Sequence, residues 1–328
     1  MGSMTESSSI KRIGNSSDFF EIASESHSEA DLSWVRPTDC RANIAKILCE
    51  VNAQVEGENI LSRKCLGGEE QYQANIEAIY DGLDDMNQKM FCSLRRIFIE
   101  REFFGSGYAS VLSRKNANGQ TESLPGAIMG LRKSILKKSP SLMSLLNWKE
   151  QGNFVKVTEQ FIAPLEFPVY ESTTPPPLLQ YILAHEFGHL FDFANGVTQV
   201  ENSIENCENQ TLNEENDHPQ KCKPSMRKGS FGSFSWKNLD SPLLEKDFYG
   251  RNRLCFYRCK TFMTNDEMLK LYQGLAASDF ISTYAATNPL DDFAEAWAVR
   301  WLLNTGKDLN LKVNKEFQIH TKDNYESE

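Results

Sequence analysis

The chain has 328 residues, of which 40% are hydrophobic, and its formal net charge is -10 at pH 7. This length allows one large domain or two small lobes with an ample core. The acidic charge argues against a nucleic-acid surface, and no apolar run reaches the roughly 18 residues of a membrane span. We therefore expect neither a nucleic-acid partner nor a membrane span.

Residues 1–35 are rich in Ser and Glu and contain few apolar residues in register. This composition predicts a mostly disordered leader, and its first residues, MGSM, resemble the remnant of an expression tag. The sequence shows no signal peptide, although an engineered start would have removed one. We expect the folded domain to cover 36–310 and a polar tail to cover 311–328.

Residues 36–105 predict a largely helical N-terminal part. The stretches 41–54 and 69–91 carry apolar residues at helical spacing and predict two or three helices, and 95–102 predicts a strand. A second part, the upper lobe, covers 106–196.

Within the upper lobe, residues 124–136 (LPGAIMGLRKSIL) read as a strand that leads into a helix. An amphipathic helix at 139–151 and a short strand at 153–161 follow. A strand at the edge of a sheet binds extended peptide through its main chain. We assign this role to four residues, with an ordinary core strand as the alternative. They are Ala127, Ile128, Met129 and Gly130.

The stretch LAHEFGHLFDFANG, residues 183–196, contains the pattern His-Glu-x-x-His. Three prolines precede a broad apolar surface and Gly196 ends it, which predicts a buried helix. On a helix, His185 and His189 lie one turn apart and can bind one metal ion. Glu186 lies beside them, where its carboxylate can reach a metal-bound water. Two histidines do not complete a catalytic zinc site, so a third ligand must come from elsewhere.

Two downstream segments offer this third ligand, because no further histidine follows within the motif. Glu214 or Glu215 lies in a polar stretch of the insert 197–274, which reads as an exposed loop or a lid. The stretch 282–303 instead predicts a buried helix that begins at Asn288 and Pro289. Asp291 and Glu295 are four residues apart on it and therefore share one face. Buried carboxylates need a partner, and a metal ion is one.

HEFGH followed by a distant Tyr-x-x-Thr-Asn-x-x-acid-x-Phe-Ala-Glu-Ala resembles zinc metallopeptidases of the anthrax lethal factor type and related bacterial enzymes, a gluzincin-like group. The resemblance covers roughly 127–303. It implies an α+β, zincin-like fold with a small mixed sheet, an active-site helix and a ligand-bearing helix at 275–310. It also implies that Tyr284 stabilises an oxyanion.

The resemblance also bears on which acidic residue binds the metal and which one contacts a histidine. The family ligand is usually glutamate, whereas Asp291 is shorter, so either Asp291 or Glu295 binds the metal. We favour Asp291 as the ligand, with Glu295 accepting a hydrogen bond from a ligand histidine. Asp192 could do the same for the other histidine or form a local hydrogen bond within its helix.

These residues together predict a zinc-dependent endopeptidase with one Zn²⁺ per chain that acts on protein or peptide substrates. The sequence leaves the oligomeric state open, and we favour a monomer. Glu186 would be the general base for a zinc-activated water. A metal-binding module without turnover is one alternative. A zinc amidase that acts on a non-peptide or cell-wall amide is the other.

Eight cysteines are present, and Cys207 and Cys222 lie in a very hydrophilic segment where a disulfide would explain them. This pattern favours a secreted or extracellular protein, with a periplasmic protein or an injected effector as alternatives. A four-cysteine zinc site that adds Cys255 and Cys259 has poor spacing.

Overall fold

The computed structural model of the chain describes residues 23–24, 33–52, 60–103, 105–115, 118, 121–138, 141–154, 168–201, 224–256, 262–314 and 317–327. The predicted leader and the predicted strand at 153–161 lie largely outside these residues. Glu214 and Glu215 lie wholly outside them. The described part mixes helices with small sheets, so the expected α+β class is confirmed.

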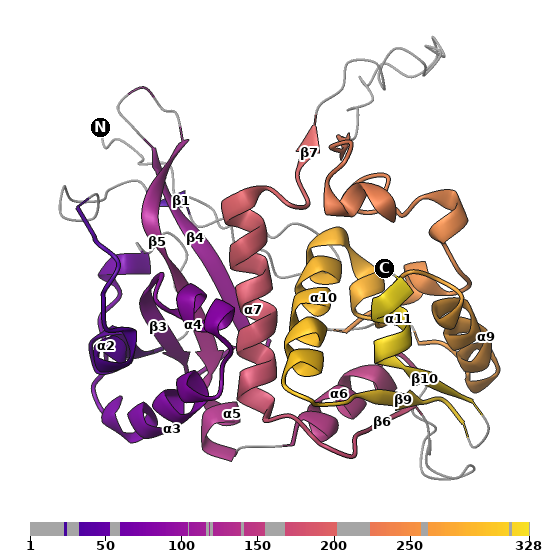
Figure 1. Cartoon of the computed structure of the whole chain (residues 1–328), viewed down its shortest axis with the longest axis horizontal. Coiled ribbons are helices and arrows are strands. Elements are labelled where there is room, and N and C mark those ends of the chain that lie inside the picture. Colours follow the sequence, from indigo (N-terminus) through magenta and orange to yellow (C-terminus); the bar gives the residue numbers. More distant parts are fainter. Residues whose placement is uncertain are drawn as a thin grey trace, which may run out of the picture.

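A five-stranded mixed sheet forms one side of the molecule, with the strand order β1-β4-β5-β3-β2 (Figure 1). β4 and β5 are antiparallel, and the other neighbouring strands are parallel. The five strands are β1 (Ala23–Ser24), β2 (Leu48–Val51), β3 (Leu94–Glu100), β4 (Gly107–Lys115) and β5 (Thr121–Arg132).

Side chains alternate between the two faces of this sheet, as strand geometry requires. On β5, Ala127, Met129 and Leu131 point into the main hydrophobic core. Leu124 and Ile128 point to the opposite face, where a smaller apolar cluster forms. The sheet is therefore covered on both faces, and the helices that carry the predicted motifs pack on the main-core face.

Helices α2 (Cys40–Ile47), α3 (Glu70–Asp81) and α4 (Asp85–Phe91) pack buried residues into the main core, on one face of the sheet. The expectation of a helix through residue 54 is wrong beyond Ile47, because the chain turns into β2 there. All four residues of β2 are buried and pair with β3, which favours an extended strand in the sheet over another helical turn. Segments 36–105 and 106–196 therefore contribute to the same sheet.

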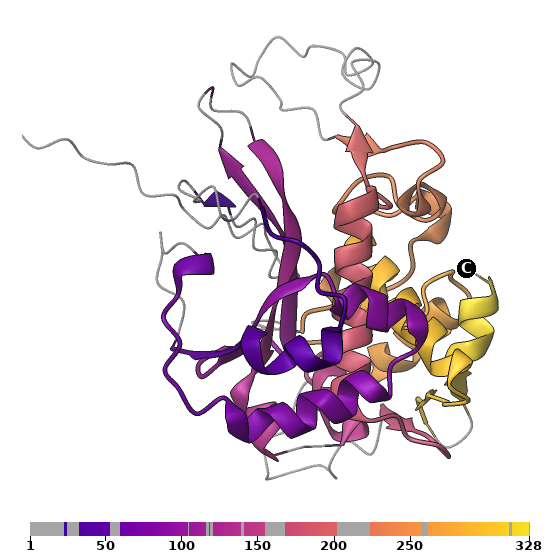
Figure 2. The same ribbon diagram turned by 60° about the vertical axis from the view of Figure 1, so that its left-hand side comes forward.

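Two long helices form the centre of the molecule. α7 (Leu178–Asn195) lies between the sheet and α10 (Pro289–Asn304), as Figures 1 and 2 both show. α7 begins after Pro177 and ends at Gly196, whose φ of 63° suits a residue without a Cβ atom. α10 begins at Asn288, whose side chain accepts hydrogen bonds from the first backbone N–H groups. Both helices confirm the predictions.

The insert contributes to the folded body through its described residues. It contains the antiparallel strands β7 and β8, three short 3-10 helices and α9, and a further 3-10 helix, η5, precedes α10. Their bounds are β7 (Val200–Glu201), β8 (Ser225–Met226), η2 (Phe231–Phe234), η3 (Leu244–Lys246), η4 (Arg251–Arg253), α9 (Asn265–Ala276) and η5 (Ala285–Thr287). Trp236 and Tyr272 are fully buried there.

The segment expected to be a polar tail packs on the core. β9 (Asn310–Lys312) pairs with β6 (Val169–Glu171) and β10 (Gln318–His320), and α11 (Thr321–Ser327) follows. Leu311, Val313 and Ile319 are buried, so a few apolar residues in an otherwise polar stretch anchor it. The remaining elements are η1 (Ile60–Ser62), α5 (Lys133–Lys138) and α6 (Leu142–Gln151). Among the described residues, none of the helices has the length and hydrophobicity that crossing a bilayer requires.

Asp308 connects the C-terminal region to the segment before α7. Its carboxylate accepts hydrogen bonds from Thr174 N at 2.9 Å, Thr174 Oγ1 at 2.8 Å and Ser172 Oγ at 2.8 Å. Burial alone would raise the pKa of Asp308, but these hydrogen bonds outweigh it and hold the pKa well below the usual carboxyl range. The ionised form is therefore favoured by folding.

We expect Asp308→Asn to lower the free energy of unfolding at pH 7 by about 1 kcal/mol, after allowance for solvent screening. A carboxyl group whose pKa is lower in the folded state than in the unfolded state stabilises the fold at pH values above its unfolded pKa. This stabilisation is lost as the pH falls toward the folded pKa. The difference from wild type should therefore shrink below about pH 4. Urea unfolding at several pH values tests this, with the exposed Asp323→Asn as control. A difference that grows in acid would contradict the assignment.

Candidate metal centre

α7 places the two histidines of the motif on one face, as predicted. His185 and His189 are one helical turn apart, both are buried, and their Nε2 atoms are 3.2 Å apart. The helix is almost completely buried between the sheet and α10, which explains why apolar residues surround the motif on all sides. Both imidazoles therefore point toward α10.

Asp291, in the first turn of α10, completes this group. Its Oδ1 atom lies 3.4 Å from His189 Nε2 and 3.8 Å from His185 Nε2. The other oxygen, Oδ2, accepts a hydrogen bond of 2.6 Å from the amide of Asn288. Asn288 is also the N-cap of α10 and accepts from the Asp291 backbone N–H. One residue thus begins the helix and orients the carboxylate.

The three donor atoms fit a small tetrahedral cation. Bonds of about 2.0–2.1 Å at tetrahedral angles place ligand atoms about 3.3 Å apart. The observed separations of 3.2, 3.4 and 3.8 Å are close to this value. The residues His185, His189 and Asp291 are therefore a candidate metal-binding group.

A second cluster of potential ligands does not fit a metal. Cys49, Cys65 and Glu69 also lie close together. The two cysteines form a disulfide, however, and a disulfide sulfur lacks the thiolate charge that binds zinc. Cys255 is also disulfide-bonded, which excludes the four-cysteine zinc site. Cys207, Cys222 and Cys259 lie outside the described residues.

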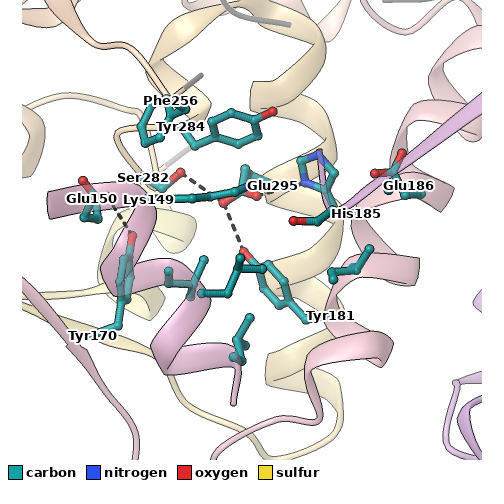
Figure 3. Close-up of a pocket in the computed structure, with 16 residues that line it drawn as sticks. Lys149, Glu150, Tyr170, Tyr181, His185, Glu186, Phe256, Ser282, Tyr284 and Glu295 are labelled. Carbon is teal, nitrogen blue, oxygen red and sulfur yellow. Dashed lines mark hydrogen bonds and ion pairs between the residues drawn. The ribbon is translucent and has the colours of Figure 1, made fainter. Parts of the chain in front are cut away.

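The carboxylate of Glu295 lies on the Nδ1 side of His185 and is not one of the three donor atoms that converge on the candidate metal position. Its Oε1 atom is 2.9 Å from His185 Nδ1, a contact of ion-pair distance without hydrogen-bond alignment. Its Oε2 atom accepts hydrogen bonds of 3.1 Å from Tyr181 and from Ser282 (Figure 3). The structure therefore brings Asp291, and not Glu295, to the Nε2 atoms. Asp291 is also the residue that we favoured as the metal ligand from the sequence.

The electrostatics of the cluster favour a bound cation. Burial alone would raise the pKa of Asp291, but His189 outweighs it and lowers the pKa below the usual carboxyl value. Burial alone would lower the pKa of His185, but Glu295 outweighs it and raises the pKa. With Glu186, three carboxylates are buried around two imidazoles. A divalent cation would offset this excess of negative charge.

Glu186 lies beside the histidines, at the boundary between α7 and β4. Burial raises the pKa of its carboxyl group. A Cβ atom added to Gly107, the first residue of β4, would lie 3.1 Å from Glu186 Oε1. A glycine therefore leaves room for this carboxylate next to the sheet. Glu186 and His185 line one side of a pocket that also reaches Tyr284 and Glu295.

Tyr284 also lines this pocket, near His185 (Figure 3). Its ring centre is 5.8 Å from that of His185. Phe256 contacts the ring edge-on at 4.9 Å, and Lys149 Nζ lies 4.6 Å from the ring centre. Phe256 comes from the insert and Lys149 from α6. Sequence analysis did not identify either residue, because neither belongs to a motif.

Asp192 has a local partner. Thr198 donates hydrogen bonds to its carboxylate from its backbone N–H, at 2.7 Å, and from its hydroxyl. This arrangement stabilises the turn that follows α7, so the partner of Asp192 is local but lies beyond the helix and not within it. A contact from Asp192 to a ligand histidine stays a prediction.

The edge-strand prediction for Ala127 to Gly130 is wrong. These residues belong to β5, which pairs with β3 on one side and β4 on the other, so its main chain is not free. The strand next to α7 is β4, which the sequence analysis missed. β1 covers β4 only at Ser113 and Arg114, so the main chain of β4 near Gly107 is left without a second strand partner among the described residues.

Residues of the insert hold α10 in place. Trp236 Nε1 donates a 2.8 Å hydrogen bond to Asp292, the residue after the candidate ligand. Arg251 donates from its guanidinium to the carbonyl of Ala286, in the short helix before α10, at 3.1 Å. The described part of the insert is thus a support of the metal centre, and no local pattern in the sequence indicated this.

No family model, no curated protein and no solved structure matches the chain. The function must therefore be inferred from the geometry of the site and from its chemistry.

We expect Asn288→Ala to weaken zinc binding about 10- to 100-fold, because the Asp291 carboxylate loses the donor that orients it. Asn288→Ser keeps an N-capping oxygen but lacks the amide donor, so it should retain helix stability and still bind zinc weakly. Competition titration with a chelator measures both affinities. Wild-type affinity in the Ser variant would show that the amide has no part in holding the ligand.

Proposed function

We propose that the protein is a zinc metallopeptidase of the zincin type that hydrolyses internal peptide bonds. The observation that carries this proposal is the convergence of His185, His189 and Asp291 next to a buried carboxylate, Glu186. His185 and Glu186 also line a pocket. A metal site alone would serve a binding protein. A carboxylate beside it that is not a ligand is what a hydrolase requires as general base.

The donor set supports zinc as the metal. Two imidazole nitrogens and one carboxylate oxygen are the ligands of many catalytic zinc sites, which keep a further position open. When bound, zinc would supply a Lewis acid that activates water near neutral pH and polarises the carbonyl of the substrate. The substrate carbonyl would approach from the pocket that His185 and Glu186 line.

The residues of the chain have distinct roles in this reaction. Glu186 accepts a proton from the attacking water and later donates it to the leaving amine. Tyr284 donates its hydroxyl proton in a hydrogen bond to the oxygen on which negative charge develops. The main chain of β4 near Gly107, which lacks a second strand partner among the described residues, can pair with an extended peptide, the role that we had assigned to β5.

The location of the protein is a second part of the proposal. Cys40–Cys92 and Cys49–Cys65 are disulfides. Such bonds persist in oxidising compartments and are rare in the cytosol. We therefore propose a secreted enzyme that acts on protein or peptide substrates.

Cleavage of a diverse peptide library, read by mass spectrometry, tests the activity. We expect zinc-loaded wild type to cut internal bonds. Glu186→Gln should reduce the rate at least about 100-fold while it retains its zinc, because it loses the base but no ligand. The exposed Glu171→Gln is the matched control and should cut like wild type. Cuts that persist in the Glu186 variant would come from another protease and would refute the proposal.

Zinc stoichiometry separates the two acidic residues of α10. Asp291→Ala removes a ligand and should abolish stoichiometric zinc binding. Glu295→Gln removes only a contact behind His185, so we expect one zinc per chain with an affinity about 10- to 100-fold lower. Metal analysis after dialysis, with circular dichroism to verify folding, makes the comparison. The reverse ranking would make Glu295 the ligand.

A further inference from the structure

Three consecutive residues before η5 connect the pocket to two buried carboxylates. Ser282 donates its hydroxyl to Glu295, and Thr283 donates its hydroxyl to Glu150. Tyr284 follows and lines the pocket (Figure 3). The segment 282–284 is therefore held at two successive residues directly before the proposed oxyanion donor.

Glu150 is the less expected of these two carboxylates. It lies at the C-terminal end of α6, is 2% exposed and forms no ion pair within the described part of the chain. Its oxygens accept hydrogen bonds from Tyr170 at 3.2 Å, from Tyr272 at 2.8 Å and from Thr283. Burial raises the pKa of Glu150 against the opposing effect of these donors. A buried carboxylate without a cation is costly, and three hydroxyl donors offset that cost only in part.

The donors to Glu150 come from separate parts of the chain. Tyr170 belongs to β6, Tyr272 to α9 and Thr283 to the segment before η5, while Glu150 itself belongs to α6. The Glu150 carboxylate therefore restrains the position of segment 282–284 relative to α6 and the rest of the core. The preceding residue of α6, Lys149, lies over the ring of Tyr284. The C-terminal end of α6 thus makes two contacts at this place. Glu150 binds Thr283, the residue before Tyr284, and Lys149 lies over the Tyr284 ring.

We propose that Glu150 is a positioning residue for catalysis, which holds Thr283 so that the Tyr284 hydroxyl faces the reacting carbonyl. This inference rests on the proposed function, because it takes Tyr284 as the oxyanion donor. Ring contacts alone restrict the tilt of an aromatic side chain, whereas the hydrogen bond of Thr283 restrains the backbone that carries it. A displacement of about 1 Å at such a donor is enough to lower a rate strongly.

A double-mutant cycle tests this role. Thr283→Val preserves shape but removes the donor to Glu150, and we expect it to lower kcat about tenfold, with KM and zinc content unchanged. In a Tyr284→Phe background the same substitution should have no further effect, because the group that it positions is gone. Glu150→Gln should show the same dependence on Tyr284, since an amide oxygen is a weaker acceptor than a carboxylate.

Thr174→Val is the matched control, because the Thr174 hydroxyl also donates to a carboxylate, that of Asp308, and neither residue lines the pocket. It should keep kcat within about twofold of wild type at a similar loss of stability. Losses from Thr283→Val that persist unchanged in the Tyr284→Phe background would overturn the proposal. So would an equal loss of kcat in the control.

A second measurement separates this inference from the proposed function. Absence of Glu186-dependent cleavage in wild type would refute the peptidase and leave the position of Tyr284 to be examined directly. A crystal structure of the Thr283→Val variant should then show the Tyr284 ring displaced from its 5.8 Å separation from His185. An unchanged ring position in that structure would overturn the positioning role of Glu150.

Discussion

The contact between α7 and α10 determines the geometry of the candidate metal centre. Gly188, within the HEFGH motif, faces α10 so closely that an added Cβ atom would lie 2.8 Å from the Ala294 Cα atom. Such a distance leaves no space for a side chain, so the helices can approach only because residue 188 is glycine and residue 294 is small. At this separation of the helices, the short side chain of Asp291 reaches the histidines. A glutamate at position 291, which is longer by one methylene group, would suit a larger separation between the two helices.

The site is also constrained by its burial. His185, Glu186, His189, Asp291 and Glu295 are all less than a tenth exposed. Each carboxylate in such surroundings destabilises the fold unless hydrogen bonds or opposite charge offset the loss of hydration. Asn288, Tyr181 and Ser282 supply part of this compensation to Asp291 and Glu295. A divalent cation would supply the remainder, which connects metal binding to the stability of the domain.

The parts of the molecule that support the site are distant from it in sequence. Trp236 and Arg251 of the insert bind α10 and the short helix before it. Glu150 of α6 binds the segment before Tyr284. The two halves of the site are thus joined through packing and buried hydrogen bonds contributed by at least two further segments. Their role is to maintain the alignment of a few polar atoms to within a fraction of an ångström.

The sequence by itself determined the local features of this protein. Helical periodicity and end signals predicted α7 and α10, and the spacing of four residues placed His185 with His189 and Asp291 with Glu295, because an α-helix repeats every 3.6 residues. Only the tertiary structure decided that Asp291 meets the Nε2 atoms, that β4 and not β5 borders the site, and that Thr283 donates to Glu150. These relations join residues far apart in the chain. They depend on helix separation and strand order, which no local pattern encodes.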